Sequence, residues 1–343
     1  MANHDARVLD VIRSRQPCAT TDIVAVTGLS PATVKRVVGR LVADGSVRVS
    51  GRGRATRYGL SPAYEVLTPF DVDAYYAHEV DQRSIHQSFN WDLLETVLPA
   101  LSLLSAAEAA RLAELDATFR GNIARLGPAA RRRELERLAI DLSWKSSQIE
   151  GNTYSLLETE RLLKDKQTAA GKTLDEATML LNHKTAIDFI MENPDYLVPL
   201  SVPRIEDIHS LLIADLDVER NVRNVRVGVT GTNYRPLDNA FQIREALEMA
   251  CRVINAKDSA FERALLAMLL ISYIQPFVDG NKRTARIVGN AVLLGGSTCP
   301  LSFRTVDAVD YQKAMLIFYE QGNVSPFKDI FIAQFAFAVG TYF

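Results

Sequence analysis

The hydrophobic pattern of the first sixty residues predicts three helices followed by a β-hairpin. Apolar residues recur at helical spacing in 5–15, 20–28 and 30–45. The third stretch begins with Ser30 and Pro31 and stops at Gly45, and these residue types are usual at the start and end of a helix. The alternation in 46–60, around Gly-Arg-Gly, predicts two antiparallel strands.

This order of elements resembles a winged helix-turn-helix domain, which we place at residues 1–62.

In a winged helix, the third helix enters the DNA major groove and the wing contacts the backbone. Four residues are expected on the groove side: Thr33, Lys35, Arg36 and Arg40. Four arginines are expected near phosphates: Arg48, Arg52, Arg54 and Arg57. Residues 1–60 hold ten lysines and arginines against four aspartates, so this segment carries +6 and the rest of the chain −8. The asymmetry favours double-stranded DNA as a partner; the competing interpretation is a solvated basic face used for dimerisation or protein contacts.

The stretch 63–140 is expected to contain a linker and N-terminal helices that pack on the next domain. Residues 61–75 carry prolines and acids, and are predicted to be linker. The apolar pattern of 91–120 predicts two helices that meet near Pro99.

A long helix is predicted from about 134 to 151. Ser146 and Glu150 are four residues apart and share one face of it. Because the helix dipole disfavours an acid near a C-terminal end, Glu150 stands out. Further helices are predicted at 155–166, 172–193 and 203–214. His183 and His209 fall within apolar helical patterns, so we expect core packing or a structural hydrogen bond for both.

Two apolar runs between 261 and 294 are separated by a turn. The first run, 261–274, is long and apolar enough to be a central buried helix. Pro276 breaks it, and the Asp-Gly-Asn of 279–281 is a turn signal. The helix that restarts at about Asn281 presents unpaired N–H groups to the loop, which makes an anion site.

Three side chains around this turn fit a bound phosphate group. Arg283 and Arg286 are three residues apart, share a face and can both turn toward phosphates. Asp279 is the carboxylate available to a Mg²⁺ ion that bridges those phosphates. Turn, helix start, two arginines and an acid together predict a nucleotide-phosphate site.

The string from 275 to 286 resembles the Fic motif, H-P-F-x-[D/E]-G-N-G-R-x-x-R. The matching residues are Pro276, Phe277, Asp279, Gly280, Asn281, Arg283 and Arg286. The resemblance covers roughly residues 90–343. It implies a mainly α fold, with the winged helix followed by an all-helical Fic-type domain that carries a small β-hairpin flap.

The same resemblance implies an activity and its site residues. Fic proteins bind ATP and Mg²⁺ and transfer AMP to a Ser, Thr or Tyr hydroxyl of a target protein. The implied nucleotide-binding residues are Gly280, Asn281, Lys282, Arg283 and Arg286. Asp279 would hold the metal, and Gln275, Asn281 and Arg283 would occupy catalytic positions.

Two other segments are similar to family features. Residues 146-SSQIEG-151 resemble the inhibitory motif [S/T]-x-x-x-E-[G/N]. The resemblance implies that Ser146, Glu150 and Gly151 form an inhibitory segment and that Glu150 pairs with Arg286. Residues 225–237 alternate and resemble the flap that holds a target segment by strand pairing. Its docking residues would be Val229, Thr230, Gly231, Thr232 and Tyr234. The Fic domain is therefore placed at 141–343, with the inhibitory helix at about 134–151, the flap at about 225–237 and the Fic loop at 275–286.

Two positions depart from the motif. Gln275 stands where the family has the histidine that acts as general base, and a carboxamide neither accepts nor releases a proton near pH 7, so we expect a rate roughly 10²–10⁴ lower. Lys282 replaces the second motif glycine; a lysine also occurs there in the related Doc kinases, which transfer the γ-phosphate. The sequence leaves three functions open: an impaired, autoinhibited adenylyltransferase, a DNA-binding regulator whose degenerate Fic domain is a nucleotide sensor or dimer scaffold, and a Doc-like phosphotransferase. If Gln275 replaces a native histidine, the natural enzyme is active.

Composition adds limits to these hypotheses. No apolar stretch approaches the roughly 18 uncharged residues of a membrane span, and the N-terminus lacks an apolar signal core, so we expect a cytoplasmic protein without a membrane partner. Cys18, Cys251 and Cys299 are too scattered to indicate a disulfide framework or a zinc site. A homodimer remains open.

Overall fold

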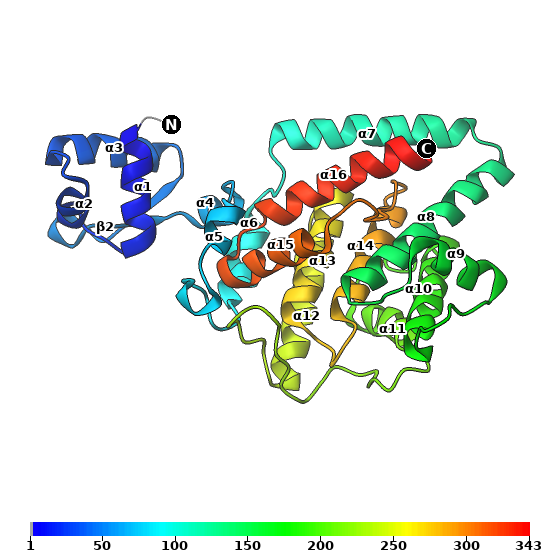
Figure 1. Ribbon diagram of the computed structural model, residues 1–343. Helices are drawn as coiled ribbons and strands as arrows, with labels where there is room; N and C mark the ends of the chain where they lie inside the picture. The colour runs from blue at the N-terminus through cyan, green and yellow to red at the C-terminus, as the bar shows by residue number, and fades with distance from the viewer. Residues whose placement is uncertain (1–2) are drawn as a thin grey trace. The chain divides into compact units, whose positions relative to one another are not determined.

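The computed structural model describes residues 3–343, which are mostly helical (Figure 1). They divide into two compact units, one of residues 3–70 with Gln321–Ser325 and one of Asp71–Glu320 with Pro326–Phe343. The predicted fold class is confirmed: it is mainly α, with one two-stranded sheet in the described chain. The domain limits expected at residues 62 and 140 stay predictions.

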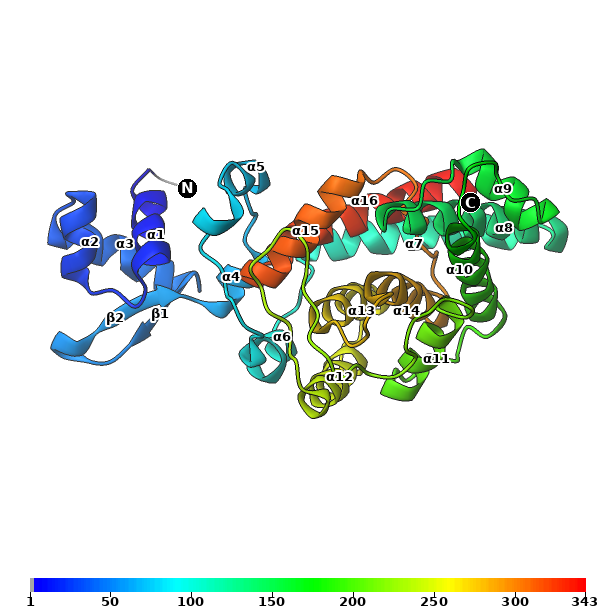
Figure 2. The same cartoon turned by 60° about the horizontal axis from the view of Figure 1, so that its bottom comes forward.

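The first unit has the element order of a winged helix. Its elements are α1 (Asn3–Arg15), α2 (Thr20–Thr27), α3 (Pro31–Ala43), β1 (Val47–Ser50), the 3₁₀ turn η1 (Gly53–Ala55), β2 (Arg57–Leu60) and α4 (Pro62–Leu67). Ser30 caps α3 by accepting a hydrogen bond from the Thr33 N–H, as its sequence predicts. The antiparallel strands pair Val47 with Leu60 and Ser50 with Arg57, and Figure 2 shows their ribbon beside α1 and α3. A compact core results, because the expected stripe of α3 is buried: Val34, Val37, Val38 and Leu41.

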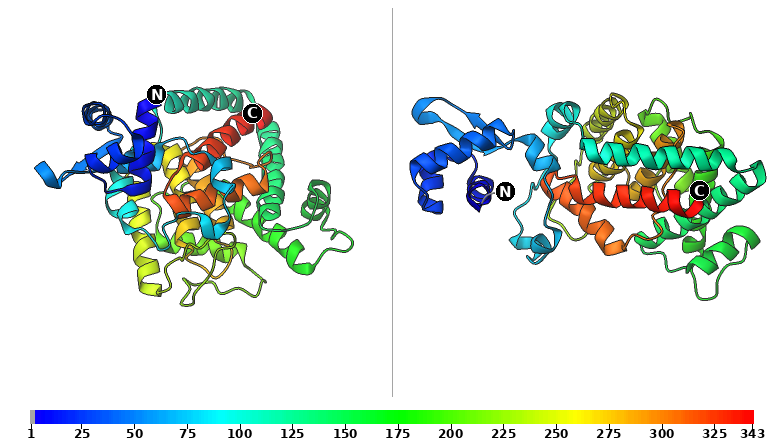
Figure 3. Two further views of the ribbon diagram at one scale, coloured as in Figure 1. Left: turned by 60° about the vertical axis from the view of Figure 1, so that its left-hand side comes forward. Right: turned by 90° about the horizontal axis from the view of Figure 1, so that it is seen from above.

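The second unit is a bundle of helices. In chain order they are α5 (Val72–Tyr76), η2 (Val80–Gln82), the π-turn η3 (Leu93–Val97), α6 (Leu98–Ala100), α7 (Ala106–Arg125), α8 (Pro128–Ile149), α9 (Leu156–Asp165), α10 (Leu174–Glu192), α11 (Val202–Leu212), α12 (Ala240–Asn255), α13 (Ala260–Ile274), α14 (Asn281–Gly295), α15 (Ala308–Gln321) and α16 (Ser325–Tyr342). Helix α16 runs beside α7, as both views of Figure 3 show, and Lys328 of α16 forms an ion pair of 2.9 Å with Glu108 of α7.

Helices α13 and α14 form the centre of the second unit (Figure 2). Nearly every residue of both is buried, so α13 is apolar on all sides, as expected for an enclosed helix. A Cβ at Gly289 of α14 would clash with the Met268 side chain and lie 3.2 Å from the Ala264 carbonyl. The two helices therefore pack closely, and they carry the loop between them on a rigid base.

The structure corrects two local predictions. Instead of two long helices meeting near Pro99, the stretch 91–120 contains the short elements η3 and α6, a break, and α7, which starts after the capping residue Ser105. The stretch 225–237 turns at Thr230 and Gly231 but forms no strand ladder of its own among the described residues. Its backbone groups bond elsewhere: the Val225 and Leu237 carbonyls accept hydrogen bonds from one arginine side chain. We keep the name flap for residues 225–237.

No helix within residues 3–343 is long and apolar enough to cross a membrane.

Candidate functional site

The loop after α13 is held by its own side chains. Gln275 ends the helix in the left-handed conformation (φ 51°) and is 8% exposed. Its amide Nε2 donates to the Ser272 carbonyl at 2.6 Å, and its Oε1 accepts from Asn281 Nδ2 at 3.0 Å. Asn281 also accepts from the Phe277 N–H at 2.8 Å and donates to the Phe277 carbonyl at 2.9 Å. Gln275 and Asn281 thus brace the loop against its two flanking helices.

Gly280 starts α14 with a φ of 80°, which favours glycine. One turn later, Arg283 is 2% exposed, and its Nη2 donates to the Asp279 carboxylate at 2.8 Å. Its Nε and Nη1 have no hydrogen-bond partner among the described residues. Because a buried guanidinium normally has partners for its donors, these two nitrogens at a helix N-terminus fit an anionic ligand.

Glu150 lies against the second motif arginine, the partner that the sequence predicts. Arg286 is fully buried and its Nη2 donates to Glu150 Oε1 at 2.7 Å. Lys282 Nζ lies 3.6 Å from the other carboxylate oxygen. Burial raises the pKa of Glu150, but Arg286 and Lys282 outweigh burial and hold that pKa below its ordinary value. Glu150 is therefore ionised at neutral pH and pairs with Arg286 and Lys282 of α14. Gly151 follows it at a φ of 96°.

Ser146 strengthens the same contact. Arg286 donates from Nε to Ser146 Oγ at 2.7 Å and from Nη2 to the Ser146 carbonyl at 2.9 Å. Ser146 Oγ also lies 2.6 Å from His183 Nε2. Burial, with Arg286 and Arg283 nearby, lowers the pKa of His183 well below its ordinary value, so the ring is neutral. The guanidinium of Arg286 also lies 5.2 Å from the Tyr311 ring centroid.

Two residues outside the predicted set also hold the loop. His209 stacks on Phe277 with ring centroids 3.6 Å apart, and its Nε2 lies 3.1 Å from the Asp279 carbonyl. Arg223 donates from Nε to the Gln275 carbonyl at 2.7 Å. The apolar pattern around His209 predicts its burial but not its contact with the loop. Nothing in the sequence distinguishes Arg223 from Arg220 and Arg226.

The flap lies on the second unit through several contacts. Arg83 donates to the Gly231 carbonyl at 2.7 Å, and the Arg235 N–H donates to the Gln87 carbonyl at 2.8 Å. Tyr234, predicted to dock a target, is 3% exposed and donates its hydroxyl to the Tyr273 carbonyl at 3.2 Å. The structure therefore places Tyr234 in the core rather than on a docking face. The other docking candidates are only partly buried or exposed: Val229, Thr230, Gly231 and Thr232.

The DNA-binding candidates are spread over α3 and the wing of the first unit. Lys35 and Arg36 are exposed on α3, whereas Arg40 pairs with Asp5 of α1. Thr33 is partly buried and its hydroxyl lies 2.9 Å from that of Ser30. Three wing arginines are exposed (Arg48, Arg52 and Arg54), and Arg57 is half-buried against neighbouring carbonyls.

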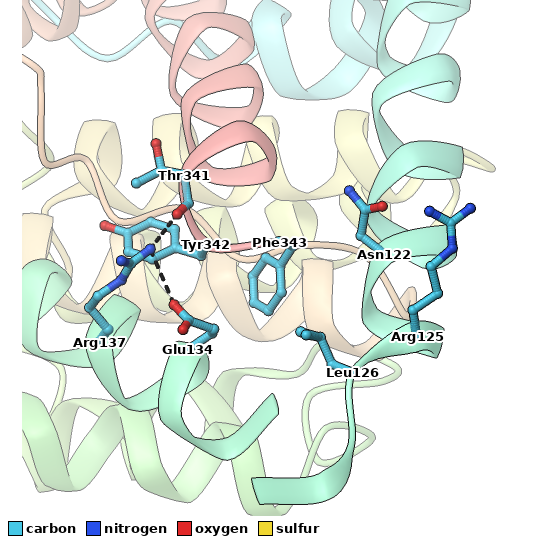
Figure 4. A pocket seen from close by; sticks show the side chains of 8 residues that line it. All are labelled: Asn122, Arg125, Leu126, Glu134, Arg137, Thr341, Tyr342 and Phe343. Carbon is cyan, nitrogen blue, oxygen red and sulfur yellow. Dashed lines mark hydrogen bonds and ion pairs between the residues drawn. The ribbon is translucent and has the colours of Figure 1, made fainter. Parts of the chain in front are cut away.

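A separate cavity of about 460 Å³ lies between α7, α8 and the end of α16 (Figure 4). Arg137 lies at one side of it, bonded to Glu134 and to the Thr341 carbonyl. Its lining includes none of the residues predicted for the nucleotide site.

Two segments of the chain match models of known protein families. Residues 199–293 match the model of the Fic/DOC family. Residues 16–61 match the model described as transcriptional regulator DIP2311-like, C-terminal domain.

The chain is also similar to curated proteins named protein adenylyltransferase Fic. One from Nematostella vectensis is 28% identical over 198 residues, which cover 54% of this chain and 44% of that protein. One from Drosophila willistoni is 26% identical over 222 residues, which cover 63% of this chain and 44% of that protein. The chain thus spans less than half the length of these curated relatives.

Solved structures of Fic proteins are similar to this chain in fold. Fic-1 (residues 134–508) from C. elegans has a TM-score of 0.59 at 21% identity, with 70% of this chain and 73% of that chain covered. A Fic domain containing signaling protein from Bacteroides thetaiotaomicron has a TM-score of 0.57 at 18% identity, with 68% of this chain and 95% of that chain covered. Residues 199–293 thus match the Fic/DOC family model, and the chain is similar in fold to solved Fic structures.

Proposed function

We propose that this chain is an autoinhibited Fic-type protein adenylyltransferase whose site binds ATP but transfers AMP poorly. The observation that carries the proposal is the buried pair of arginines on α14. Arg283 and Arg286 both retain guanidinium nitrogens without partners among the described residues, beside the N-terminus of a helix. Buried arginine donors and a helix N-terminus are a strong combination for phosphate groups.

The residues present fit Mg²⁺ as well as ATP. The Asp279 side chain is 63% exposed and lies beside Arg283. Within residues 3–343, no group of three His, Cys, Asp or Glu side chains could hold a metal ion. The single exposed carboxylate of Asp279 fits Mg²⁺, which is often bound by one or two carboxylates together with substrate phosphates. The bound ion would neutralise phosphate charge, and Asp279 would hold it next to Arg283.

Gln275 limits transfer rather than binding. In the proposed reaction, a target hydroxyl oxygen bonds to the α-phosphorus of ATP, the bond to pyrophosphate breaks, and the hydroxyl proton must be taken up. The Gln275 amide has no basic atom, and both of its ends already bond within the loop. The proton would pass to solvent, so we expect a rate roughly 10²–10⁴ lower than with a general base.

Glu150 supplies the proposed inhibition. It occupies Arg286 through a 2.7 Å ion pair, so a nucleotide phosphate must compete with a carboxylate for that guanidinium. A carboxylate at this position also repels the phosphate directly. Removing Glu150 would therefore strengthen ATP binding and release Arg286 for phosphate.

The test compares the chain with a Gln275→His, Glu150→Gly double variant in α-labelled and γ-labelled ATP. Both are incubated with Mg²⁺ and a cell lysate as the source of target hydroxyls, and ATP binding is measured in parallel by calorimetry. We expect α-label on protein only with the double variant. Glu160→Gly is the matched control, because Glu160 is a surface acid paired with Lys164 at 2.6 Å.

The other outcomes separate the competing functions. Label from γ alone would favour Doc-like phosphotransfer, consistent with Lys282 in the loop. ATP binding without any label in the double variant would favour a nucleotide sensor. If neither the chain nor its Glu150→Gly variant binds ATP with Mg²⁺, the proposal is wrong.

A second function, DNA binding by the first unit, has its own support. The match of residues 16–61 to a transcriptional-regulator domain coincides with exposed cations on α3 and the wing. Under this hypothesis Lys35 and Arg36 would face the groove, while Arg52 and Arg54 would meet phosphates. Titration of labelled duplex DNA at increasing salt tests it: we expect affinity to fall steeply with salt, and an absence of binding at low salt would exclude the function.

A further inference from the structure

Arg223 connects three stretches of backbone through one buried side chain. Its guanidinium donates from Nε to the Gln275 carbonyl at 2.7 Å, from Nη1 to the Val225 carbonyl at 2.7 Å, and from Nη2 to the Leu237 carbonyl at 2.5 Å. Its backbone N–H donates to the Pro276 carbonyl at 2.9 Å. The residue therefore bonds to the first two carbonyls of the nucleotide loop and to both ends of the flap.

The charge of Arg223 is balanced in an unusual way. The residue is fully buried, and no carboxylate forms an ion pair with it within residues 3–343. Burial lowers its pKa, yet an arginine remains protonated in proteins. Burying a cation is costly, and here carbonyl dipoles, together with the more distant Asp238 carboxylate, offset the cost. Each of the three carbonyls is thus held by a charge-assisted bond that breaks at a penalty.

The acceptors are placed so that the loop and the flap bond to the same guanidinium group. Val225 and Leu237 begin and end the flap, so the guanidinium closes its neck. Gln275 begins the loop that carries Asp279 and the start of α14. Within the flap, Tyr234 bonds to the carbonyl of Tyr273, which lies just before the loop. A movement of the flap neck therefore pulls on the same side chain that holds the loop.

We infer that Arg223 is a positioning residue that couples the conformation of the loop at 275–281 to that of the flap at 225–237. When the neck of the flap opens, the Gln275 carbonyl loses its donor and the loop loosens; when the loop is held, the neck is closed. This inference takes its functional meaning from the proposed nucleotide site, but the coupling itself exists without nucleotide.

The planar fork of arginine is what the arrangement requires. Three acceptors lie around three different nitrogens, and a lysine ammonium is a single point with a different reach. A lysine would keep the charge yet could not reproduce the three directions. Arg223→Lys therefore separates a role of the fork from a role of charge alone.

The experiment is hydrogen–deuterium exchange on the nucleotide-free full chain and its Arg223→Met and Arg223→Lys variants. We expect exchange in the Met variant to rise at least about tenfold in both the flap and the loop, because each loses a charge-assisted bond. The Lys variant should show a smaller rise in the same two stretches. Helix α13 should keep its protection. Arg133→Met is the control, since Arg133 is 79% exposed on α8, outside the flap and the loop, and pairs with the neighbouring Glu134.

Each outcome decides the inference. A rise in only one of the two stretches, or in neither, would overturn the coupling. A Lys variant identical to the parent chain would show that charge alone suffices and would overturn the role of the fork. If both variants lose protection throughout α13, Arg223 is a residue of global stability and the inference is wrong.

A nucleotide titration distinguishes this inference from the proposed function. If the parent chain binds no ATP but the two stretches still respond together to Arg223, the coupling stands and the proposed function fails. If the parent chain binds ATP while the two stretches respond separately, the proposed function stands and the coupling fails.

Discussion

The wing of the first unit and the loop of the second each present arginines suited to phosphate, yet the two sets have opposite surroundings. Arg48, Arg52 and Arg54 of the wing are exposed. In the second unit, Arg283 is 2% exposed and Arg286 is fully buried. Arg286 is bonded to Ser146 and Glu150, whereas none of the three wing arginines forms an ion pair within residues 3–343.

The difference shows what burial does to one residue type. An exposed arginine is solvated and free to move, so it suits a nucleic-acid backbone that it contacts from water, with an affinity that salt controls. A buried arginine has already lost its water and needs partners at all times. Glu150 and Ser146 provide them for Arg286, so the contact that we propose to be inhibitory also stabilises the fold.

The two regions should differ most in how much the removal of one arginine lowers the free energy of unfolding. We expect Arg286→Met to lower the free energy of unfolding by roughly 3–5 kcal/mol, because it leaves Glu150 partly buried without its partner. Arg52→Met should change it by no more than about 0.5 kcal/mol. Urea denaturation of both variants provides the measurement. Equal losses would contradict the distinction between the two regions.

The two regions should also differ in how their arginines affect the affinity for ATP. Arg283→Met is expected to weaken ATP binding roughly tenfold to a hundredfold, since it removes charge-assisted bonds to phosphate. Arg36→Met, in the first unit, should leave ATP affinity unchanged. Calorimetry in the Glu150→Gly background gives both values. Unchanged affinity in the Arg283 variant would remove that arginine from the site.

For DNA binding, we expect the wing arginines to matter and the arginines of the second unit to have no effect. Replacing Arg52 and Arg54 by alanine should reduce the slope of log affinity against log salt by about one for each phosphate that these arginines neutralise. Arg283→Met should leave that slope as it is. Fluorescence anisotropy with duplex DNA over a salt series provides the comparison. A slope that is insensitive to both wing residues would assign the basic wing to another role.

The smallest expected effect is a pH dependence that comes from Glu150. Its pKa is held below the ordinary value in the folded chain, because Arg286 and Lys282 outweigh burial. The ion pair therefore stabilises the fold above the unfolded-state pKa of about 4.3, and that stability is lost as the pH falls toward the folded-state pKa. We expect the parent chain to lose more stability than Glu150→Gln between about pH 6 and pH 3. Parallel losses would show that Glu150 carries no such linkage.

Much of the architecture follows from local pattern. Ser30 and Pro31 start α3, and the alternation around Gly-Arg-Gly gives the two strands. The apolar run before Gln275 is the buried helix α13. Each of these depends on capping, alternation or burial within a few residues, so short-range physics suffices.

Prediction failed where distant partners compete for the backbone. The alternation in the flap predicts a hairpin, but Arg223 takes the carbonyls at both ends, and Tyr234 turns into the core. The helix expected at 91–98 is reduced to a π-turn and a short helix before the break that precedes α7. In these stretches, interactions with other parts of the chain outweigh the local pattern.

By itself, the sequence determined the order of helices and strands in the first unit and the buried helix α13 with the loop that follows it. The pairing of Glu150 with Arg286 came from a resemblance to a family motif. Only the tertiary structure showed that His209 and Arg223 hold that loop, and that His183 lies on Ser146. The physical reason is that a buried polar side chain takes whichever partner the fold brings within about 3 Å. For Arg223, those partners are carbonyls up to 52 residues away in the chain, and no local pattern of apolar and polar residues records them.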